Sequence, residues 1–83
     1  MTYDDQIDTR GLLCPLPVLK ARKRLGQMSP GEVLLLLADD PAAVVDVPHY
    51  CAEAGHSLLH QDETTEGLRF LIARAGKTES PQQ

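Results

Sequence analysis

The pattern of apolar and polar residues predicts four short strands along the chain. Residues 4–9 alternate weakly around Ile7, which favours a short edge strand. Residues 32–38 form an almost continuous apolar run, as expected for a central strand that is covered on at least one face. Residues 57–63 and 68–75 read as a less buried and a more cleanly alternating strand, and residues 64–67 connect them as a hairpin.

A first amphipathic helix is predicted over residues 15–27. Val18, Ala21, Leu25 and Met28 recur at helical spacing and are expected to face the core, with Leu19 beside them. The sequence Ser-Pro-Gly at residues 29–31 then ends the helix and begins a turn.

A second helix is predicted between residues 40 and 55, with Asp40 as its N-cap and Pro41 at its first helical position. Because proline lacks the backbone N–H and clashes with the preceding turn, Pro48 is expected to kink this helix or split it in two before Gly55 ends it. One stripe of the helix contains Ala42, Val45, His49 and Ala52.

The predicted order is therefore strand, helix, strand, helix, strand, strand. Each helix has one apolar stripe and the central strand needs a cover, so the economical fold is an α/β two-layer sandwich, with both helices on one face of a four-stranded mixed sheet. Residues 1–75 are expected to form a single domain, and the polar residues 76–83 a disordered tail.

Composition narrows the class of protein. The net charge of −4 argues against direct binding of nucleic acid, which depends on neutralising phosphates. Two cysteines are too few for a disulfide framework, so we expect a reducing, cytoplasmic location. The longest apolar run, residues 33–38, is too short to span a bilayer, and no membrane association is expected.

The candidate chemistry centres on Cys14, which precedes Pro15, Leu16 and Pro17. Pro15 is expected at the first helical position, which makes Cys14 the N-cap and predicts that the helix dipole lowers the pKa of its thiol. Only Leu16 keeps an amide in this first turn that can point back at the sulfur. Pro17 stands where a thioredoxin-type motif has its second cysteine, so sulfur on Cys14 would remain there until a partner's thiol attacks it.

The sequence around Cys14 resembles the TusA/SirA family of small sulfur-carrier proteins. The resemblance lies in the stretch Asp-Thr-Arg-Gly-Leu-Leu-Cys-Pro-Leu-Pro at residues 8–17, and it extends to residues 30–32, 38–41 and 46–48. It implies that Cys14 accepts sulfane sulfur as a transient persulfide, without any other cofactor, and passes it to a protein partner. The residues that would support the motif are Asp8, Gly11, Pro15 and Pro17.

The resemblance also implies the kinds of partner. The donor would be a cysteine desulfurase or a rhodanese and the acceptor a DsrE-like protein, in a relay for tRNA thiolation or in sulfur oxidation. Many members have a basic residue before the cysteine, where this chain has Leu13, and Leu16 replaces an acidic residue of the best-known members in the tRNA pathway. Five of the eight basic residues cluster near Cys14 and can be either a solvated face or a docking surface for an acidic partner. The candidate docking residues are Arg10, Leu13, Leu16, Lys20, Lys23 and Arg24.

Several other interpretations are compatible with the sequence. Cys14 can be an ordinary buried cysteine that behaves as a small hydrophobe. Cys51 lies near three histidines, but their spacing fits no established closed metal site, and we expect no metal. A disulfide between Cys14 and Cys51 is a further alternative, as is a regulatory or RNA-associated adaptor, although the acidic charge and the few aromatic residues argue against RNA binding.

Overall fold

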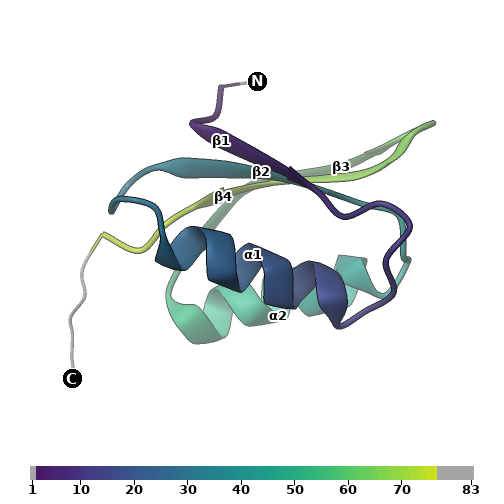
Figure 1. Cartoon of the computed structure of the whole chain (residues 1–83), viewed down its shortest axis with the longest axis horizontal. Coiled ribbons are helices and arrows are strands. Elements are labelled where there is room, and N and C mark those ends of the chain that lie inside the picture. Colours follow the sequence, from purple (N-terminus) through teal and green to yellow (C-terminus); the bar gives the residue numbers. More distant parts are fainter. Residues whose placement is uncertain (1, 77–83) are drawn as a thin grey trace.

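The computed structural model describes residues 2–76 as a two-layer α/β fold (Figure 1). The four strands form one mixed sheet in the order β1-β2-β4-β3, in which β1 is parallel to β2 and the other two neighbouring pairs are antiparallel. Both helices lie on the same face of the sheet (Figure 1), which confirms the fold predicted from the sequence. The elements are β1 (Asp5–Asp8), α1 (Leu16–Gly26), β2 (Val33–Ala38), α2 (Ala43–Ala54), β3 (Ser57–Thr64) and β4 (Gly67–Ala73). Apart from Gly76, the predicted tail lies outside the described residues.

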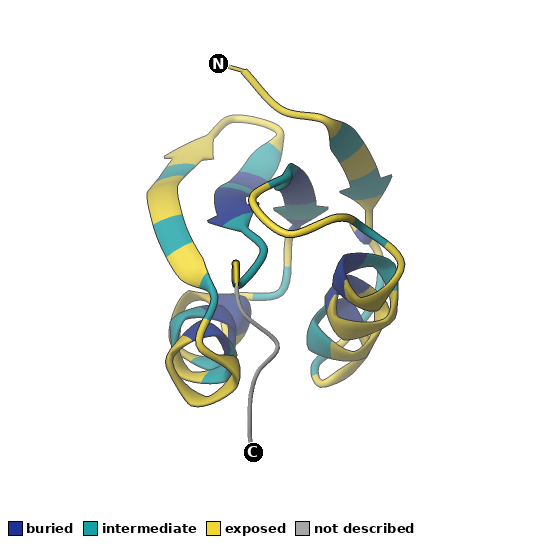
Figure 2. Ribbon diagram, turned by 90° about the vertical axis from the view of Figure 1, so that its left-hand side faces the viewer, coloured by how far each residue is buried: buried dark blue, intermediate teal, exposed yellow. Residues whose placement is uncertain are grey.

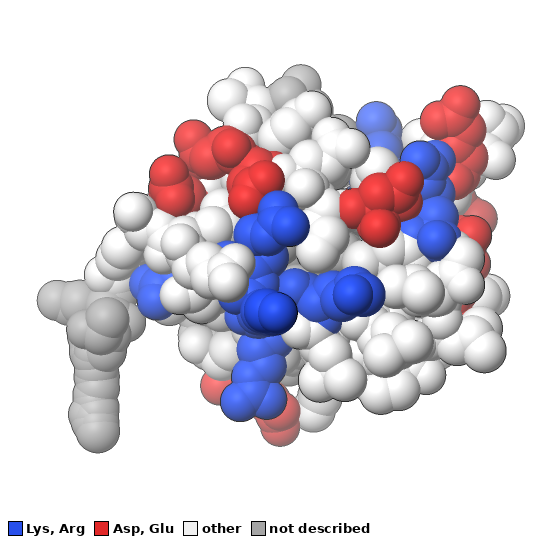
Figure 3. All heavy atoms as spheres, in the orientation of Figure 1, with Lys and Arg blue, Asp and Glu red and all other residues white. Residues whose placement is uncertain are grey.

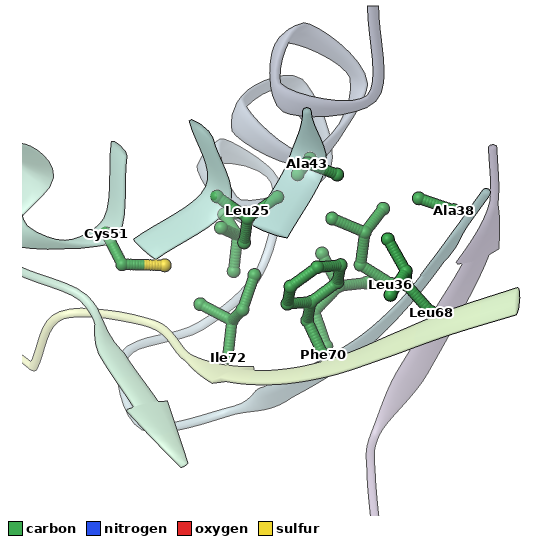
Figure 4. Close-up of a cluster of buried hydrophobic side chains, with 11 residues drawn as sticks. Leu25, Leu36, Ala38, Ala43, Cys51, Leu68, Phe70 and Ile72 are labelled. Atoms are coloured by element: carbon green, nitrogen blue, oxygen red, sulfur yellow. The ribbon is translucent and has the colours of Figure 1, made fainter. Parts of the chain in front are cut away.

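The hydrophobic core lies between the helices and the two central strands. Leu36 of β2 and Phe70 and Ile72 of β4 are completely buried, and they point toward Leu25 of α1 and toward α2 (Figure 4). Figure 2 shows that the buried parts of both helices face the sheet, whereas their outer sides are exposed. The alternation that predicted β4 therefore reflects one face packed on the helices.

The continuous apolar run of β2 is explained by burial on both faces. Leu34 and Leu36 face the helices with no exposed surface, while Leu35, on the opposite face, is still only 6% exposed. Leu35 is paired with Leu71 of β4, which is itself 8% exposed. The central position between β1 and β4 and the helices over one face confirm the prediction, and the burial of Leu35 extends the cover to the second face.

The predictions for α2 need three corrections. Its N-cap is Ala42 rather than Asp40, and the helix continues through Pro48 without being split. Proline removes only the hydrogen bond to the carbonyl of residue 44, in the first turn of the helix, so the later turns keep their bonds. The buried side of the helix consists of Ala43, Val47 and Cys51, not of the stripe through Val45, which is 70% exposed.

The hairpin between β3 and β4 depends on Gly67. Its φ of +129° is rarely adopted by residues with a side chain, and a Cβ built on it would lie 2.7 Å from the carbonyl oxygen of Ala38. The predicted hairpin between the last two strands is confirmed. The hairpin can therefore approach the end of β2 only because residue 67 has no side chain.

Candidate functional site

Cys14 lies in the loop that connects β1 to α1, directly before the helix. The backbone N–H of Cys14 donates a 2.8 Å hydrogen bond to Oδ2 of Asp40. Three residues earlier, the N–H of Gly11 donates to Oδ1 of Asp39 at 2.9 Å. Two consecutive carboxylates after the end of β2 therefore hold the loop that carries the cysteine.

Asp8 and Arg10 stabilise the start of the same loop. The Arg10 guanidinium donates from Nε and Nη2 to the two carboxylate oxygens of Asp8, at 2.9 and 2.8 Å. This side-chain pair, together with the bond from the Arg10 backbone N–H, lowers the pKa of Asp8 to about 2. Gly11 then turns the chain with a φ of +89°, which the absence of a side chain permits.

The first turn of α1 differs from the sequence prediction. Pro15, not Cys14, is the N-cap, and the peptide bond between these two residues is cis. The amide of Leu16, which the sequence left free to point at the sulfur, instead donates to the carbonyl oxygen of Leu13 at 2.9 Å. Pro17 is buried in the first turn. The backbone N–H of Leu16 is therefore not available to stabilise a thiolate on Cys14.

The pKa of the Cys14 thiol shifts in the direction opposite to the prediction. Burial of the thiol, its hydrogen bond to Asp46 and the negative charges of Asp40 and Asp46 raise the pKa to about 11. Removal from water and nearby carboxylates both disfavour the charged form of a cysteine. The lowered pKa that we expected from the helix dipole is therefore wrong, because burial of the thiol and the carboxylates of Asp40 and Asp46 dominate at this site.

Asp40 and Asp46 are site residues that the sequence analysis missed. Asp40 was interpreted only as a helix cap, although its carboxylate accepts hydrogen bonds from the backbone N–H groups of Cys14 and Ala42. These two bonds, the one from Cys14 first, lower the pKa of Asp40. The resemblance at residues 38–41 and 46–48 included both aspartates, and that was the signal available in the sequence.

Five of the six candidate docking residues fall into two groups, an apolar one beside Cys14 and a basic one along α1. Leu13 and Leu16, with exposed fractions of 73% and 44%, form an apolar rim next to the cysteine. Lys20, Lys23 and Arg24 line a groove of about 280 Å³, here called the basic groove, together with Ile7 and Gln27. Figure 3 shows basic side chains gathered over the face of the molecule that α1 covers.

Two of the predicted docking residues already have partners within the chain. Arg10 forms an ion pair with Asp8 at 2.8 Å, and Arg24 pairs with Asp5 at 3.0 Å. Lys20 forms no ion pair with any residue between 2 and 76, and neither does Lys23. Of the basic residues predicted for docking, the two lysines are therefore the ones most available to an acidic partner.

Cys51 is in a different environment from Cys14. Cys51 lies on the buried side of α2 and is only 2% exposed, and this burial raises the pKa of its thiol to about 11. Both cysteines are free thiols.

The three histidines have separate partners, since His49 pairs with Glu53, His60 pairs with Asp62, and His56 accepts the Ala75 N–H. In the part of the chain that the structure describes, no three His, Cys, Asp or Glu side chains are placed to hold a metal ion. None of the helices formed by these same residues has the length and apolar character needed to cross a membrane.

Comparisons with known proteins agree with the geometry. The family model described as sulfurtransferase TusA matches residues 5–74. Among solved structures, the chain is similar to the crystal structure of a SirA-like protein from Desulfitobacterium hafniense, with 25% sequence identity and a TM-score of 0.74. That alignment covers 89% of this chain and 100% of the other. A match over most of the sequence, with the cysteine loop and both layers of the fold inside it, shows that the chain belongs to the TusA family of sulfurtransferases.

Proposed function

We propose that the protein is a sulfur carrier that holds sulfane sulfur as a persulfide on Cys14 and delivers it to a partner protein. The family supports a sulfur-carrier or sulfurtransferase role in general. The observation that carries the finer proposal is the position of Cys14: it is partly exposed at the start of α1, while Cys51 is buried in the core. Cys14 is thus the cysteine that a partner can reach.

The transfer is a simple exchange of sulfur between thiols. The Cys14 thiolate attacks the outer sulfur of a donor persulfide, the donor's S–S bond breaks, and the donor cysteine leaves as a thiolate. In delivery, the partner's thiolate attacks the outer sulfur on Cys14, and Cys14 leaves as a thiolate that takes up a proton. No second cysteine is needed, which agrees with a proline at position 17.

We further propose that the rim of Leu13 and Leu16 and the basic groove contact these partners. An apolar patch beside a charged surface is a common basis for transient protein contacts. The donors that fit the chemistry are a cysteine desulfurase or a rhodanese, and the acceptor is a DsrE-like protein. Charge reversal at Lys20 and Lys23 should slow transfer from the donor, and added salt should slow the wild type in the same way.

The experiment is the intact mass of the reduced protein after incubation with a cysteine desulfurase and cysteine, or with a rhodanese and thiosulfate. We expect a gain of one sulfur atom that a reductant reverses and that Cys14→Ser abolishes. The matched variant Cys51→Ser should keep the gain. Sulfur acceptance by Cys14→Ser would refute the proposal, and salt-dependent RNA binding without any sulfur gain would favour an RNA-associated adaptor instead.

A further inference from the structure

A second groove lies beside Cys14, between the start of α1 and the exposed side of α2. It has a volume of about 280 Å³ and begins at Pro15, the residue after the cysteine. We call it the acidic groove; its lining residues are Pro15, Val18, Asp46, His49, Tyr50 and Glu53. It is distinct from the basic groove, which is formed by β1 and the outer side of α1.

The acidic groove carries negative charge that the protein itself does not neutralise. Asp46 forms no ion pair with any residue from 2 to 76. Glu53 has only His49 as a partner, at 3.3 Å, and that histidine is charged only when protonated. Asp46 is also one of the two carboxylates that raise the pKa of the Cys14 thiol. The same group therefore acts on the reactive sulfur and lines an open groove.

The surroundings of this groove are apolar and exposed. Leu13 is 73% exposed on the cysteine loop, and Val45, next to Asp46 in α2, is 70% exposed. Large hydrophobic side chains are costly to leave in water, and the exposed Leu13 and Leu16 flank the cysteine along the chain, so this part of the surface is suited to contact with another protein. The carboxylates of Asp46 and Glu53 in the groove then favour a partner with a positively charged side chain at this position.

We propose that the acidic groove receives a lysine or arginine side chain that lies next to the reactive cysteine of the sulfur-transfer partner, and that this cation pairs with Asp46. This inference rests on the proposed carrier function and specifies the chemistry of its partner. A basic side chain satisfies the carboxylate that has no ion pair within residues 2–76, and the apolar rim packs around the partner's cysteine loop.

The pairing has a direct consequence for the sulfur chemistry. In the free carrier, the carboxylates keep the thiol protonated, since they disfavour a second negative charge. A cation that pairs with Asp46 reduces this repulsion, so Cys14 loses its proton more readily and attacks the outer sulfur of the donor persulfide when the partner is in place. The carrier is thereby activated by docking, and it is less reactive between partners.

The test uses three small disulfides that differ in charge: cystamine, which carries two ammonium groups, the neutral 2-hydroxyethyl disulfide, and dithiodiglycolate, which carries two carboxylates. The Cys14 thiolate attacks one sulfur of the disulfide, a mixed disulfide forms, and the released thiolate takes up the proton that Cys14 lost. The measured quantity is the ratio of the second-order rate constants for cystamine and dithiodiglycolate at low ionic strength. The intrinsic reactivity of each disulfide cancels when this ratio is compared between variants.

We expect Asp46→Asn to lower this ratio by roughly threefold to tenfold, the effect of one elementary charge several ångströms from the reacting sulfur. Glu53→Gln should lower it less, and it serves as the test if Asp46→Asn does not fold. The control is Glu63→Gln, which removes the same charge from an exposed position on β3 and should change the ratio by less than about twofold. Salt should reduce the ratio in the wild type.

An unchanged ratio in the folded Asp46→Asn protein would overturn the proposal. An equal decrease in Glu63→Gln would also overturn it, because the effect would then come from total charge rather than from the groove. The assay needs no persulfide. Failure of the carrier function, seen as no sulfur gain on Cys14, and failure of the docking proposal, seen as no charge preference, are therefore separate results.

Discussion

The pKa of the Cys14 thiol is the property of the site that is most directly testable. The structure gives it as about 11, against an ordinary value of 9.0. At any pH below 9, a pKa that is two units higher gives a fraction of thiolate about a hundredfold smaller than in an ordinary cysteine. The higher basicity makes each thiolate more nucleophilic and recovers about tenfold of the loss, so the net rate of reaction near neutral pH should be about tenfold below that of an ordinary cysteine.

The perturbation is Asp46→Asn, which keeps the shape of the side chain and removes its charge. A unit charge about 4 Å away changes the ratio of thiolate to thiol by about fivefold even at the dielectric constant of water. The midpoint of the titration should therefore shift downward by several tenths of a unit or more, and the thiol should become easier to alkylate at neutral pH. Burial, which is the largest cause of the raised pKa, remains in the variant.

The assay is the rate of iodoacetamide alkylation as a function of pH, with the modified cysteine identified by mass. The midpoint of the profile reports the pKa independently of the nucleophilicity of the thiolate. Cys14→Ser supplies the background from Cys51, which is 2% exposed. A wild-type midpoint at or below 9 would refute the reasoning, because the helix N-terminus would then dominate over burial and the two carboxylates. An unchanged midpoint in Asp46→Asn would refute the role of that residue.

Three further outcomes are expected. Asp40→Asn should lower the denaturant midpoint and raise proteolysis of the cysteine loop, since an amide can accept only one of the two backbone N–H groups that Asp40 binds, one of them from Cys14. Gly67→Ala should destabilise the fold by about 1–3 kcal/mol because of its positive φ and its close contact; full stability in denaturation would contradict this. Burial, with a smaller effect of a nearby arginine, lowers the pKa of His56, which in its neutral form accepts the Ala75 N–H. The contribution of neutral His56 to the free energy of unfolding should thus be fully present above the ordinary pKa of 6.5 and decrease as the pH falls toward the lower pKa of the folded state. Denaturation at several pH values should show this decrease, and His56→Gln should abolish it.

Much of the fold could be predicted because local patterns and tertiary packing agree. The apolar run at residues 33–38 predicted a central strand covered on at least one face, and β2 lies between β1 and β4 under both helices. The predicted boundaries of α1 differ from the observed ones by a single residue at each end. The exception is α2, which has apolar residues on more than one side, including the exposed Val44 and Val45. Its sequence pattern therefore does not single out the side formed by residues 43, 47 and 51, which packing on the sheet buries.

The site was less predictable for a physical reason. The helix start at Cys14 is a local feature, and local reasoning therefore gave a lowered pKa. Asp46 is 32 residues away in the sequence, and only the packing of α2 against the cysteine loop brings its carboxylate to the thiol. Long-range electrostatic contacts of this kind have no periodicity or spacing that a single sequence displays.

A high thiol pKa is consistent with a carrier, although it would be a disadvantage in an enzyme that must attack its substrate unaided. A protonated thiol resists oxidation and exchange with small disulfides, since the thiolate is the reactive form. A carrier meets its donor as a docked protein, so the ionisation of Cys14 can depend on groups that the donor supplies. The carboxylates of Asp40 and Asp46 then have two functions: the first holds the loop through the Cys14 amide, and the second keeps the sulfur inactive until a partner's cation arrives. Under this proposal, specificity in sulfur transfer comes from the charge beside the partner's cysteine as well as from the shape of the docking surface.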